Sequence, residues 1–152
     1  MTRVCTYLNF AGQAEEAFAF YKSVFGTEFD GAISRYGDAP PKEGMPELSE
    51  SGKQLVMNVQ MPIVGDHLLL GSDVLDAPDA PDAMGGQGLN KGNNFSICIQ
   101  TDTREEADTL FAALADDGKV EMALADMFWG DYFGSFADKF GIQWMVSCSS
   151  KA

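Results

Sequence analysis

Residues 4–26 read VCTYLNFAGQAEEAFAFYKSVFG, and residues 95–118 read FSICIQTDTREEADTLFAALADDG. Each stretch begins with a short β-prone run and continues with apolar residues at the three- and four-residue spacing of a helix that packs one face on a core. A glycine then follows each helical run, in the position where glycine commonly ends a helix. The two stretches therefore predict the same strand–helix unit twice.

The repeat extends beyond these two stretches. Glu15-Glu16-Ala17 falls on Glu105-Glu106-Ala107 at an offset of 90 residues, and the same offset brings Val24 onto Leu114. Thr103 and Glu106 have the spacing of a capping box, which predicts the start of the second helix. The order β-α-β-β-β is expected twice, with strands at 4–10, 29–36, 54–63 and 67–72, a polar loop at 37–52, and a second set of strands at 95–100, 120–124, 132–136 and 142–147.

A linker is predicted between the two units. Residues 74–94 are rich in Asp, Ala, Pro, Gly and Asn and show no apolar periodicity. Because a repeated unit of this kind cannot bury its own apolar face, the units are expected to pair. We expect one α+β domain over residues 1–152, in which a module at 3–73 and a module at 95–150 enclose a cleft, the default ligand site.

Composition excludes several classes of protein. The chain has 152 residues, 45% of them hydrophobic, and it contains no long uninterrupted apolar run, so a globular protein without a membrane span is expected. It is acidic, with 23 Asp and Glu against 10 Lys and Arg and a net charge of -13. That charge repels phosphate backbones and anionic membrane surfaces, so neither nucleic acid nor membrane is an expected partner.

The cysteines and the N-terminus indicate the compartment. Cys5, Cys98 and Cys148 are odd in number and have no CxxC spacing, which argues against a disulfide framework and a thiolate zinc site. The first residues, MTRVCTYLNF, lack the basic and apolar regions of a signal peptide. A cytoplasmic protein is predicted.

The chain resembles the vicinal oxygen chelate superfamily, which includes glyoxalase I, extradiol dioxygenases and bleomycin- and fosfomycin-resistance proteins, and it resembles the PhnB-like branch most closely. The fold that this resemblance implies is the paired β-α-β-β-β module. The residues that carry it are Tyr7-Leu8-Asn9-Phe10, Glu16-Ala17, Phe20-Tyr21, Val24-Phe25-Gly26, Ile33-Ser34-Arg35-Tyr36, Gly65-Asp66, Gly71-Ser72-Asp73, Phe128-Trp129-Gly130, Asp138-Lys139-Phe140-Gly141 and Trp144.

The resemblance implies a divalent metal held by four side chains, one from the first and one from the fourth strand of each module. These places fall on Cys5 or Thr6, on Leu69, on Ser96 and on Met145. Leu has no donor atom, and Ser and Met are weak ligands for a hard cation, so no metal or other cofactor is predicted. Asn58 stands where PhnB-like relatives often have His, and the only histidine, His67, has no second imidazole to complete a site.

The alternation of side chains along a strand predicts which residues line the cleft. Leu8 and Phe10 should pack on the helix, which turns Tyr7 and Asn9 toward the cleft. Asn58 and Gln60 share a face of their strand, where their amides could bind a small polar ligand or satisfy backbone groups near the seam between subunits or between modules.

Two further residues have two interpretations each. Trp129, in the loop at residues 128–131, could cap the cleft or fill a subunit interface. Arg35 could hold a ligand carboxylate or phosphonate, or form a surface ion pair.

The sequence predicts one of two functions, which belong to different classes. The first is a PhnB-like protein that binds a small polar molecule in the cleft without a family-type metal site, and the second is a metal-dependent lyase or dioxygenase of glyoxalase type. No catalytic residue is identified. A homodimer is expected, because relatives commonly pair and because the aromatic residues Phe128, Trp129, Tyr132 and Phe133 exceed what the two small cores need.

Overall fold

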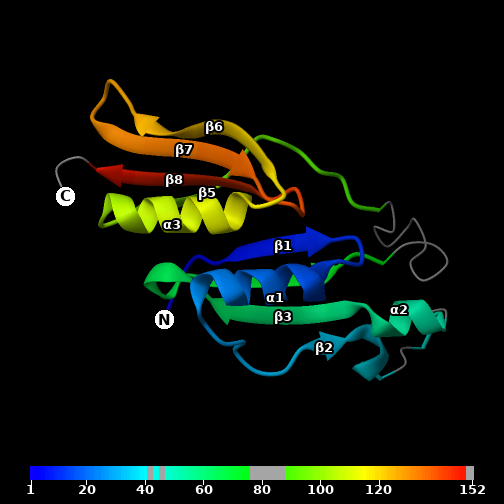
Figure 1. The fold of residues 1–152 in the computed structure, drawn as a ribbon. Coiled ribbons are helices and arrows are strands. Elements are labelled where there is room, and N and C mark those ends of the chain that lie inside the picture. The colour runs from blue at the N-terminus through cyan, green and yellow to red at the C-terminus, as the bar shows by residue number, and fades with distance from the viewer. Residues whose placement is uncertain (41–42, 45–46, 76–87, 150–152) are drawn as a thin grey trace. The chain divides into compact units, whose positions relative to one another are not determined.

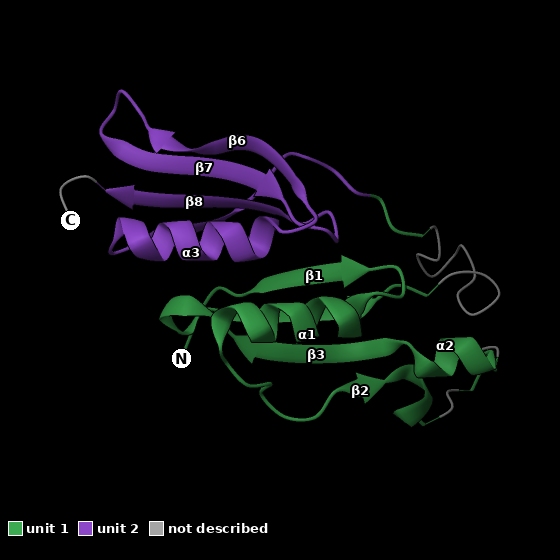
Figure 2. Cartoon of the chain, in the orientation of Figure 1, with its two compact units in different colours: residues 1–90 green, residues 91–152 purple. Residues whose placement is uncertain are grey.

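The computed structural model describes residues 1–40, 43–44, 47–75 and 88–149 (Figure 1). The chain divides into two compact units, Met1–Asn90 and Lys91–Ala152 (Figure 2). Their boundary falls within the predicted linker at 74–94, of which residues 76–87 lie outside the described residues. No helix of the described chain is long and apolar enough to cross a membrane.

Unit 1 contains a four-stranded sheet with strand order β1-β4-β3-β2. Strands β1 and β4 run parallel, and the other neighbouring pairs run antiparallel. The elements are β1 (Thr6–Phe10), α1 (Ala14–Phe25), β2 (Ser34–Arg35), the 3-10 turn η1 (Tyr36–Asp38), α2 (Glu50–Gln54), β3 (Val56–Pro62), the 3-10 turn η2 (Val64–Asp66) and β4 (Leu68–Asp73).

Unit 2 repeats this topology with strand order β5-β8-β7-β6 and a parallel β5–β8 pair. Its elements are β5 (Ile97–Thr101), α3 (Arg104–Ala115), β6 (Lys119–Asp126), β7 (Asp131–Ala137) and β8 (Gln143–Ser149). The predicted double β-α-β-β-β order and the α+β class are confirmed.

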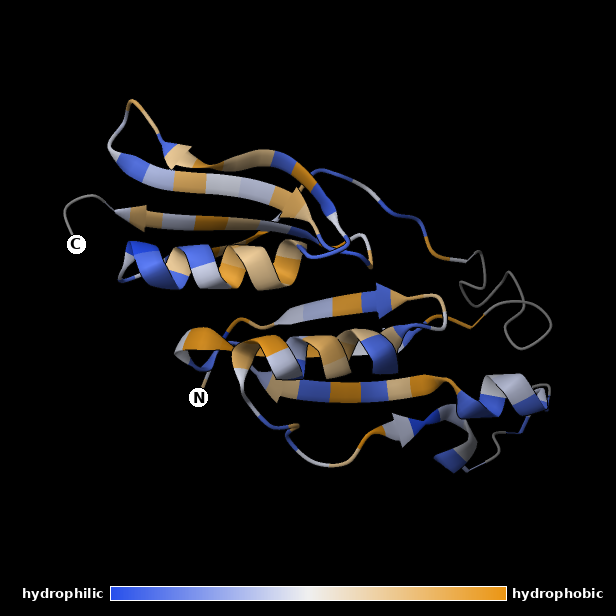
Figure 3. Cartoon of the chain, viewed as in Figure 1, coloured by the Kyte–Doolittle hydropathy of each residue, from blue (hydrophilic) through white to orange (hydrophobic). Residues whose placement is uncertain are grey.

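The core of unit 1 lies between α1 and one face of its sheet. Phe18 of α1 is fully buried, and its ring meets the ring of Phe10 edge-on at a centroid distance of 6.2 Å. A Cβ atom at Gly71 of β4 would lie 2.5 Å from the Phe18 ring, so the close approach of helix and sheet requires glycine there. Figure 3 shows that hydrophobic and hydrophilic residues alternate along part of β3. Successive residues of a strand point to opposite faces of its sheet.

The core of unit 2 lies between α3 and its own sheet. The ring of Phe111 packs against that of Phe136 at 4.8 Å, and Trp144 is fully buried. The Trp144 Nε1–H donates a hydrogen bond of 2.9 Å to Asp138 Oδ2. The largest side chain in this core therefore has its polar atom satisfied.

The helix ends follow the expected chemistry. Gly26 ends α1 in the left-handed conformation, with φ of 66°. At the start of α3 the Thr103 Oγ1 accepts a hydrogen bond of 3.1 Å from the Glu106 N–H, which confirms the predicted N-cap.

Two predicted segments differ from the structure. The strand expected at 29–36 is reduced to Ser34–Arg35, because Asp30, Gly31 and Ala32 are poor strand formers and Gly31 turns the chain with φ of 84°. The loop expected at 37–52 contains η1 and the start of α2, where the Ser49 Oγ caps the helix by accepting a hydrogen bond from the Gly52 N–H.

Candidate functional site

Polar side chains gather on the face of the unit 1 sheet that α1 does not cover. Leu8 and Phe10 are buried toward α1, so Tyr7 and Asn9, which alternate with them, point to the opposite face and are exposed. Gln60 belongs to that opposite face, because Gln60 and Tyr7 both pair with Leu70. We call this surface the polar face.

A row of four polar residues crosses all four strands of the polar face. Asn9 of β1 pairs with Ser72 of β4, and Ser34 of β2 pairs with Asn58 of β3. Continuing the β3–β4 register by one residue places Asn58 opposite Ser72. Directly paired residues of neighbouring strands share a face of the sheet. The row Asn9–Ser72–Asn58–Ser34, here called the polar row, is therefore continuous.

Some polar atoms of this face are occupied, and others are not. The Tyr7 hydroxyl donates a hydrogen bond of 3.0 Å to Ser72 Oγ, and the Gln60 Nε2 donates one of 3.0 Å to Asp30 Oδ2. The side chains of Asn9, Asn58 and Ser34 make no hydrogen bond with any residue that the structure describes. Two amides and one hydroxyl in the polar row are thus available to a ligand.

Tyr36 lies close to this face. Its hydroxyl donates a hydrogen bond of 2.8 Å to the Asp73 carbonyl oxygen. Burial raises the pKa of the Tyr36 phenol above its ordinary value, and the nearby Tyr7 and Asp73 raise that pKa further. Tyr36 is therefore an uncharged phenol at neutral pH.

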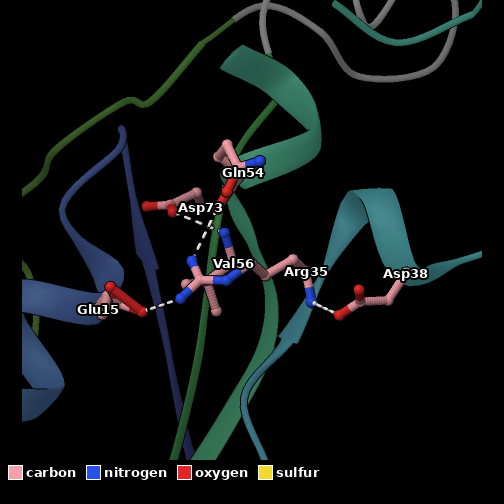
Figure 4. A network of polar contacts seen from close by, with 6 residues as sticks. All are labelled: Glu15, Arg35, Asp38, Gln54, Val56 and Asp73. Atoms are coloured by element: carbon pink, nitrogen blue, oxygen red, sulfur yellow. Dashed lines mark hydrogen bonds and ion pairs between the residues drawn. The ribbon is translucent and has the colours of Figure 1, made fainter. Parts of the chain in front are cut away.

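The buried carboxylate of Asp73 connects the elements around the polar row. Asp73 Oδ1 accepts hydrogen bonds from the backbone N–H groups of Gly12 and Ala14 at 2.9 and 3.0 Å, and Oδ2 accepts one from the Val56 N–H at 2.9 Å. These bonds tie the start of α1 and the start of β3 to the end of β4, next to Ser72. Figure 4 shows the bond between Asp73 and Val56. Asp73 thus fixes the strands that present the polar row.

Arg35 forms an ion pair, which is one of its two predicted alternatives. Its guanidinium contacts the Glu15 carboxylate and donates a hydrogen bond of 2.8 Å to the Gln54 carbonyl oxygen, while its backbone N–H donates to Asp38 (Figure 4). The Arg35 side chain therefore links α1, β2 and the end of α2, and its charge is neutralised.

In unit 1, the positions that the family resemblance assigned to a metal lie on two different faces. Thr6 pairs with Leu69 on the α1 side of the sheet, where Leu69 is fully buried and the Thr6 Oγ1 lies 2.8 Å from the His67 Nε2. On the polar face the corresponding place in β4 belongs to Leu70, and Cys5 lies just before β1. None of these offers the polar face a ligand that suits a hard cation.

In unit 2, the assigned positions lie on the sheet face opposite α3. Met145 pairs with Cys98 and with Ser135, and Ser96 is half-buried just before β5. Phe133 lies on this face in the next row, paired with Ser147. Partial burial raises the pKa of the Cys98 thiol, which keeps it protonated at neutral pH. This face therefore presents sulfur and aromatic groups where unit 1 presents amides.

These residues do not fit the divalent metal that the resemblance implies. Hard cations are held by carboxylate, carbonyl and imidazole ligands. Within residues 1–40, 43–44, 47–75 and 88–149, no three His, Cys, Asp or Glu side chains lie together so as to hold an ion. The imidazole of His67 is engaged with Thr6 on the α1 side of its sheet.

Four of the five predicted ligand residues, Tyr7, Asn9, Asn58 and Gln60, share the polar face. Trp129 belongs to unit 2, where it lies in the β6–β7 turn with its side chain 53% exposed and its ring 5.0 Å from that of Phe128. Ser34 and Ser72 were missed as site residues. Strand alternation alone does not select them, because the register between strands is needed to align them with Asn9 and Asn58.

Known proteins resemble this chain over nearly its whole length. The Glyoxalase/Bleomycin resistance protein/Dioxygenase superfamily model matches residues 6–146. Protein YjdN of Escherichia coli (strain K12) is 30% identical over 145 residues, which make up 93% of this chain and 91% of that protein.

Two solved structures extend the comparison. The crystal structure of protein PA1353 from Pseudomonas aeruginosa is 33% identical with a TM-score of 0.77, and the match covers 98% of each chain. A Bacillus cereus protein described as a putative 3-demethylubiquinone-9 3-methyltransferase, PhnB protein, is 27% identical with a TM-score of 0.68, over 97% of this chain and 100% of that one. With its two β-α-β-β-β units, the chain therefore belongs to the glyoxalase/bleomycin resistance protein/dioxygenase superfamily, in the PhnB-like branch.

Proposed function

We propose that this protein binds a small polar organic molecule on the polar face of unit 1. The observation that carries the proposal is the polar row, in which Asn9, Asn58 and Ser34 have no hydrogen-bond partner among the described residues. Each amide offers two donors and an acceptor, so a ligand that lies across β1, β4, β3 and β2 can form several hydrogen bonds at once.

The residues around the polar row hold it in a fixed arrangement, which favours ligand binding. Ser72 is held by Tyr7 from one side, and Asp73 fixes the backbone beside it through three hydrogen bonds. Because the row is already ordered, less conformational entropy is lost when a ligand binds. The aliphatic side chain of Leu70, between Tyr7 and Gln60, supplies an apolar contact beside the polar groups.

Binding in this proposal does not depend on a divalent metal. The alternative function, a metal-dependent lyase or dioxygenase, requires a ligand set for a hard cation at the first and fourth strands. Leu69 in unit 1 and Met145 in unit 2 stand at the fourth-strand places. Because neither residue is a ligand for a hard cation, the donor set favours ligand binding without a metal.

The proposal includes a homodimer in the cytoplasm. Phe128 is 98% exposed at the tip of the β6–β7 turn beside the half-exposed Trp129, and such aromatic side chains are enriched at protein interfaces. Cys5, Cys98 and Cys148 are free thiols, which is consistent with a reducing compartment.

Side-chain amide NMR tests the binding proposal. The 15N-labelled protein is titrated with N-acetylglucosamine, uridine and myo-inositol, which carry neutral hydroxyl and amide groups at different spacings. We expect at least one of them to shift the NH2 resonances of Asn9 and Asn58 while those of the exposed loop residue Asn93 stay unchanged. Equal shifts at all three residues, or none at Asn9 and Asn58, would contradict the proposal.

A further inference from the structure

We infer that the polar face selects uncharged ligands and rejects anionic ones, including phosphates, phosphonates and carboxylates. The inference rests on the proposed function and specifies the substrate class of the same site. It follows from what each strand contributes to the face: asparagine, serine, glutamine and tyrosine side chains are present, and no lysine or arginine occupies a position in its two cross-strand rows.

The basic side chains in the described helices and strands of unit 1 are already ion-paired, and Lys22 belongs to α1 on the other side of the sheet. The Arg35 guanidinium contacts Glu15, Lys22 lies 3.0 Å from Glu28, and Lys53 lies 3.3 Å from Glu50. Arg3 precedes β1 and occupies no strand position. An anionic group in the polar row would therefore meet no unpaired cation from the described strands of unit 1, and anions are bound mainly by charged donors of the Arg and Lys type.

Negative charge near the row adds to this selection. The Asp30 carboxylate accepts the hydrogen bond from Gln60 on the same face. The whole chain carries a net charge of -13. A bound phosphate would be repelled by both, and this repulsion weakens with salt, because charges are screened beyond a Debye length of about 10 Å at 0.1 M.

The phenols of the site support the same preference. Tyr36 stays protonated because burial raises its pKa, so its hydroxyl can hydrogen-bond without bringing charge. The Tyr7 hydroxyl donates to Ser72 Oγ, so this pair also brings no charge to the row. Every group presented along the polar row is thus a neutral donor or acceptor, and such groups suit hydroxyl, amide or carbonyl groups of an uncharged molecule.

Matched ligand pairs test the inference. Uridine is compared with uridine 5′-monophosphate, and N-acetylglucosamine with its 6-phosphate, in NMR titrations of the full chain read at the Asn9 and Asn58 side-chain amides. We expect at least one neutral member to bind about tenfold more tightly than its phosphorylated partner, and the difference to shrink as salt is added. Methylphosphonate alone should leave both amides unshifted.

A charge-gain variant provides the control. Ser34→Lys adds a cation at one end of the polar row, and we expect it to bind the phosphorylated members more tightly than the unmodified protein does. The matched variant Ser23→Lys places the same charge on the exposed surface of α1 and should leave the preference unchanged.

The outcomes separate the inference from the function on which it rests. Equal or tighter binding of the phosphorylated members at Asn9 and Asn58 in the unmodified protein would overturn the preference for neutral ligands and leave ligand binding intact. The absence of any shift at these amides with every compound would overturn the binding site and the inference together.

Discussion

Asp73 shows how a single residue supports the candidate site without being part of its ligand-facing surface. The side chain is almost completely buried, and both oxygens accept hydrogen bonds from backbone N–H groups. Leaving a buried donor without an acceptor costs about 1 to 3 kcal/mol. Asp73 therefore connects the stability of unit 1 to the placement of the polar row.

Replacing Asp73 by Asn should lower the free energy of unfolding by about 2 to 3 kcal/mol, because the new NH2 group cannot accept the hydrogen bonds that the lost carboxylate oxygen accepted. Urea unfolding measures the change. Asp66→Asn serves as the control, since Asp66 is exposed and Asn tolerates its positive φ. A change at Asp73 no larger than at Asp66 would refute the supporting role.

Tyr36 should make the protein less stable as the pH rises into the alkaline range. Its pKa in the folded state lies above the unfolded value of 10.0, chiefly because the phenol is buried. The folded state therefore retains a proton that the unfolded state releases, so the stabilisation is complete below pH 10 and is lost as pH rises through the folded pKa. Urea midpoints measured from pH 8 upward should fall above pH 10, and more shallowly in Tyr36→Phe. An unchanged slope in that variant would contradict this assignment.

At the scale of single residues, the sequence predicted part of the site. The alternation of Leu8 and Phe10 with Tyr7 and Asn9 correctly separated the two faces of β1, because a strand turns successive side chains in opposite directions. Ser34 and Ser72 were not recognised, because their place beside Asn58 and Asn9 depends on pairing between strands far apart in the chain.

At the scale of elements, the helix of each unit approaches its sheet closely at a glycine. In unit 1, Gly71 of β4 lies under the Phe18 ring, and in unit 2, Gly134 of β7 lies under the Phe111 ring, where a Cβ atom would come within 2.7 Å. The two glycines lie on different strands of the repeat, because β7 corresponds to β3 and not to β4. In each unit a glycine nevertheless admits a large aromatic ring of the helix close to the sheet.

Gly71→Ala should therefore destabilise the protein by about 1 to 3 kcal/mol, because Phe18 is fully buried and cannot move aside without displacing the core. Gly92→Ala is the matched control, since the only atom within 4 Å of a Cβ there lies at 3.8 Å. Thermal unfolding of the two variants provides the comparison. Equal midpoints would show that the Phe18 contact is not tight.

The elements were more predictable from sequence than their ends. Both long helices were located because their apolar spacing, Thr103 and the terminal Gly26 act locally. The segment before β2 was misjudged, because Phe29 and Ile33 suggested a strand while Gly31 and a bulge at Ser34 and Arg35 interrupt the pairing with β3.

At the scale of the whole molecule, the repeated units differ in the surfaces that they present. The unit 1 sheet offers amides and hydroxyls opposite its helix, whereas the unit 2 sheet offers Cys98, Met145 and Phe133. The two units thus share one topology, while the sheet faces opposite their helices differ in chemistry. The neutral character of the first surface is what distinguishes the proposed function from metal-dependent chemistry.

The proposed homodimer gives a prediction at this scale. Sedimentation at micromolar concentration should show a species of twice the 16.4 kDa chain mass, and added salt should favour it, because two chains of charge -13 repel each other. Replacing Phe128 and Trp129 together by Ser should weaken association, whereas Val64→Ser, an exposed apolar residue of unit 1, should not. A single species of one chain mass in all samples would contradict the dimer.

The affinity of an Asn58 variant tests the central claim most directly. The neutral molecule that shifts the Asn9 and Asn58 amides is titrated by calorimetry into the unmodified protein, Asn58→Leu and Asn93→Leu. Removing an amide that hydrogen-bonds the ligand should cost about 1.4 kcal/mol, a tenfold loss of affinity, in Asn58→Leu, with no change in Asn93→Leu. Unaltered affinity in a folded Asn58→Leu protein would show that the polar row is not the binding site.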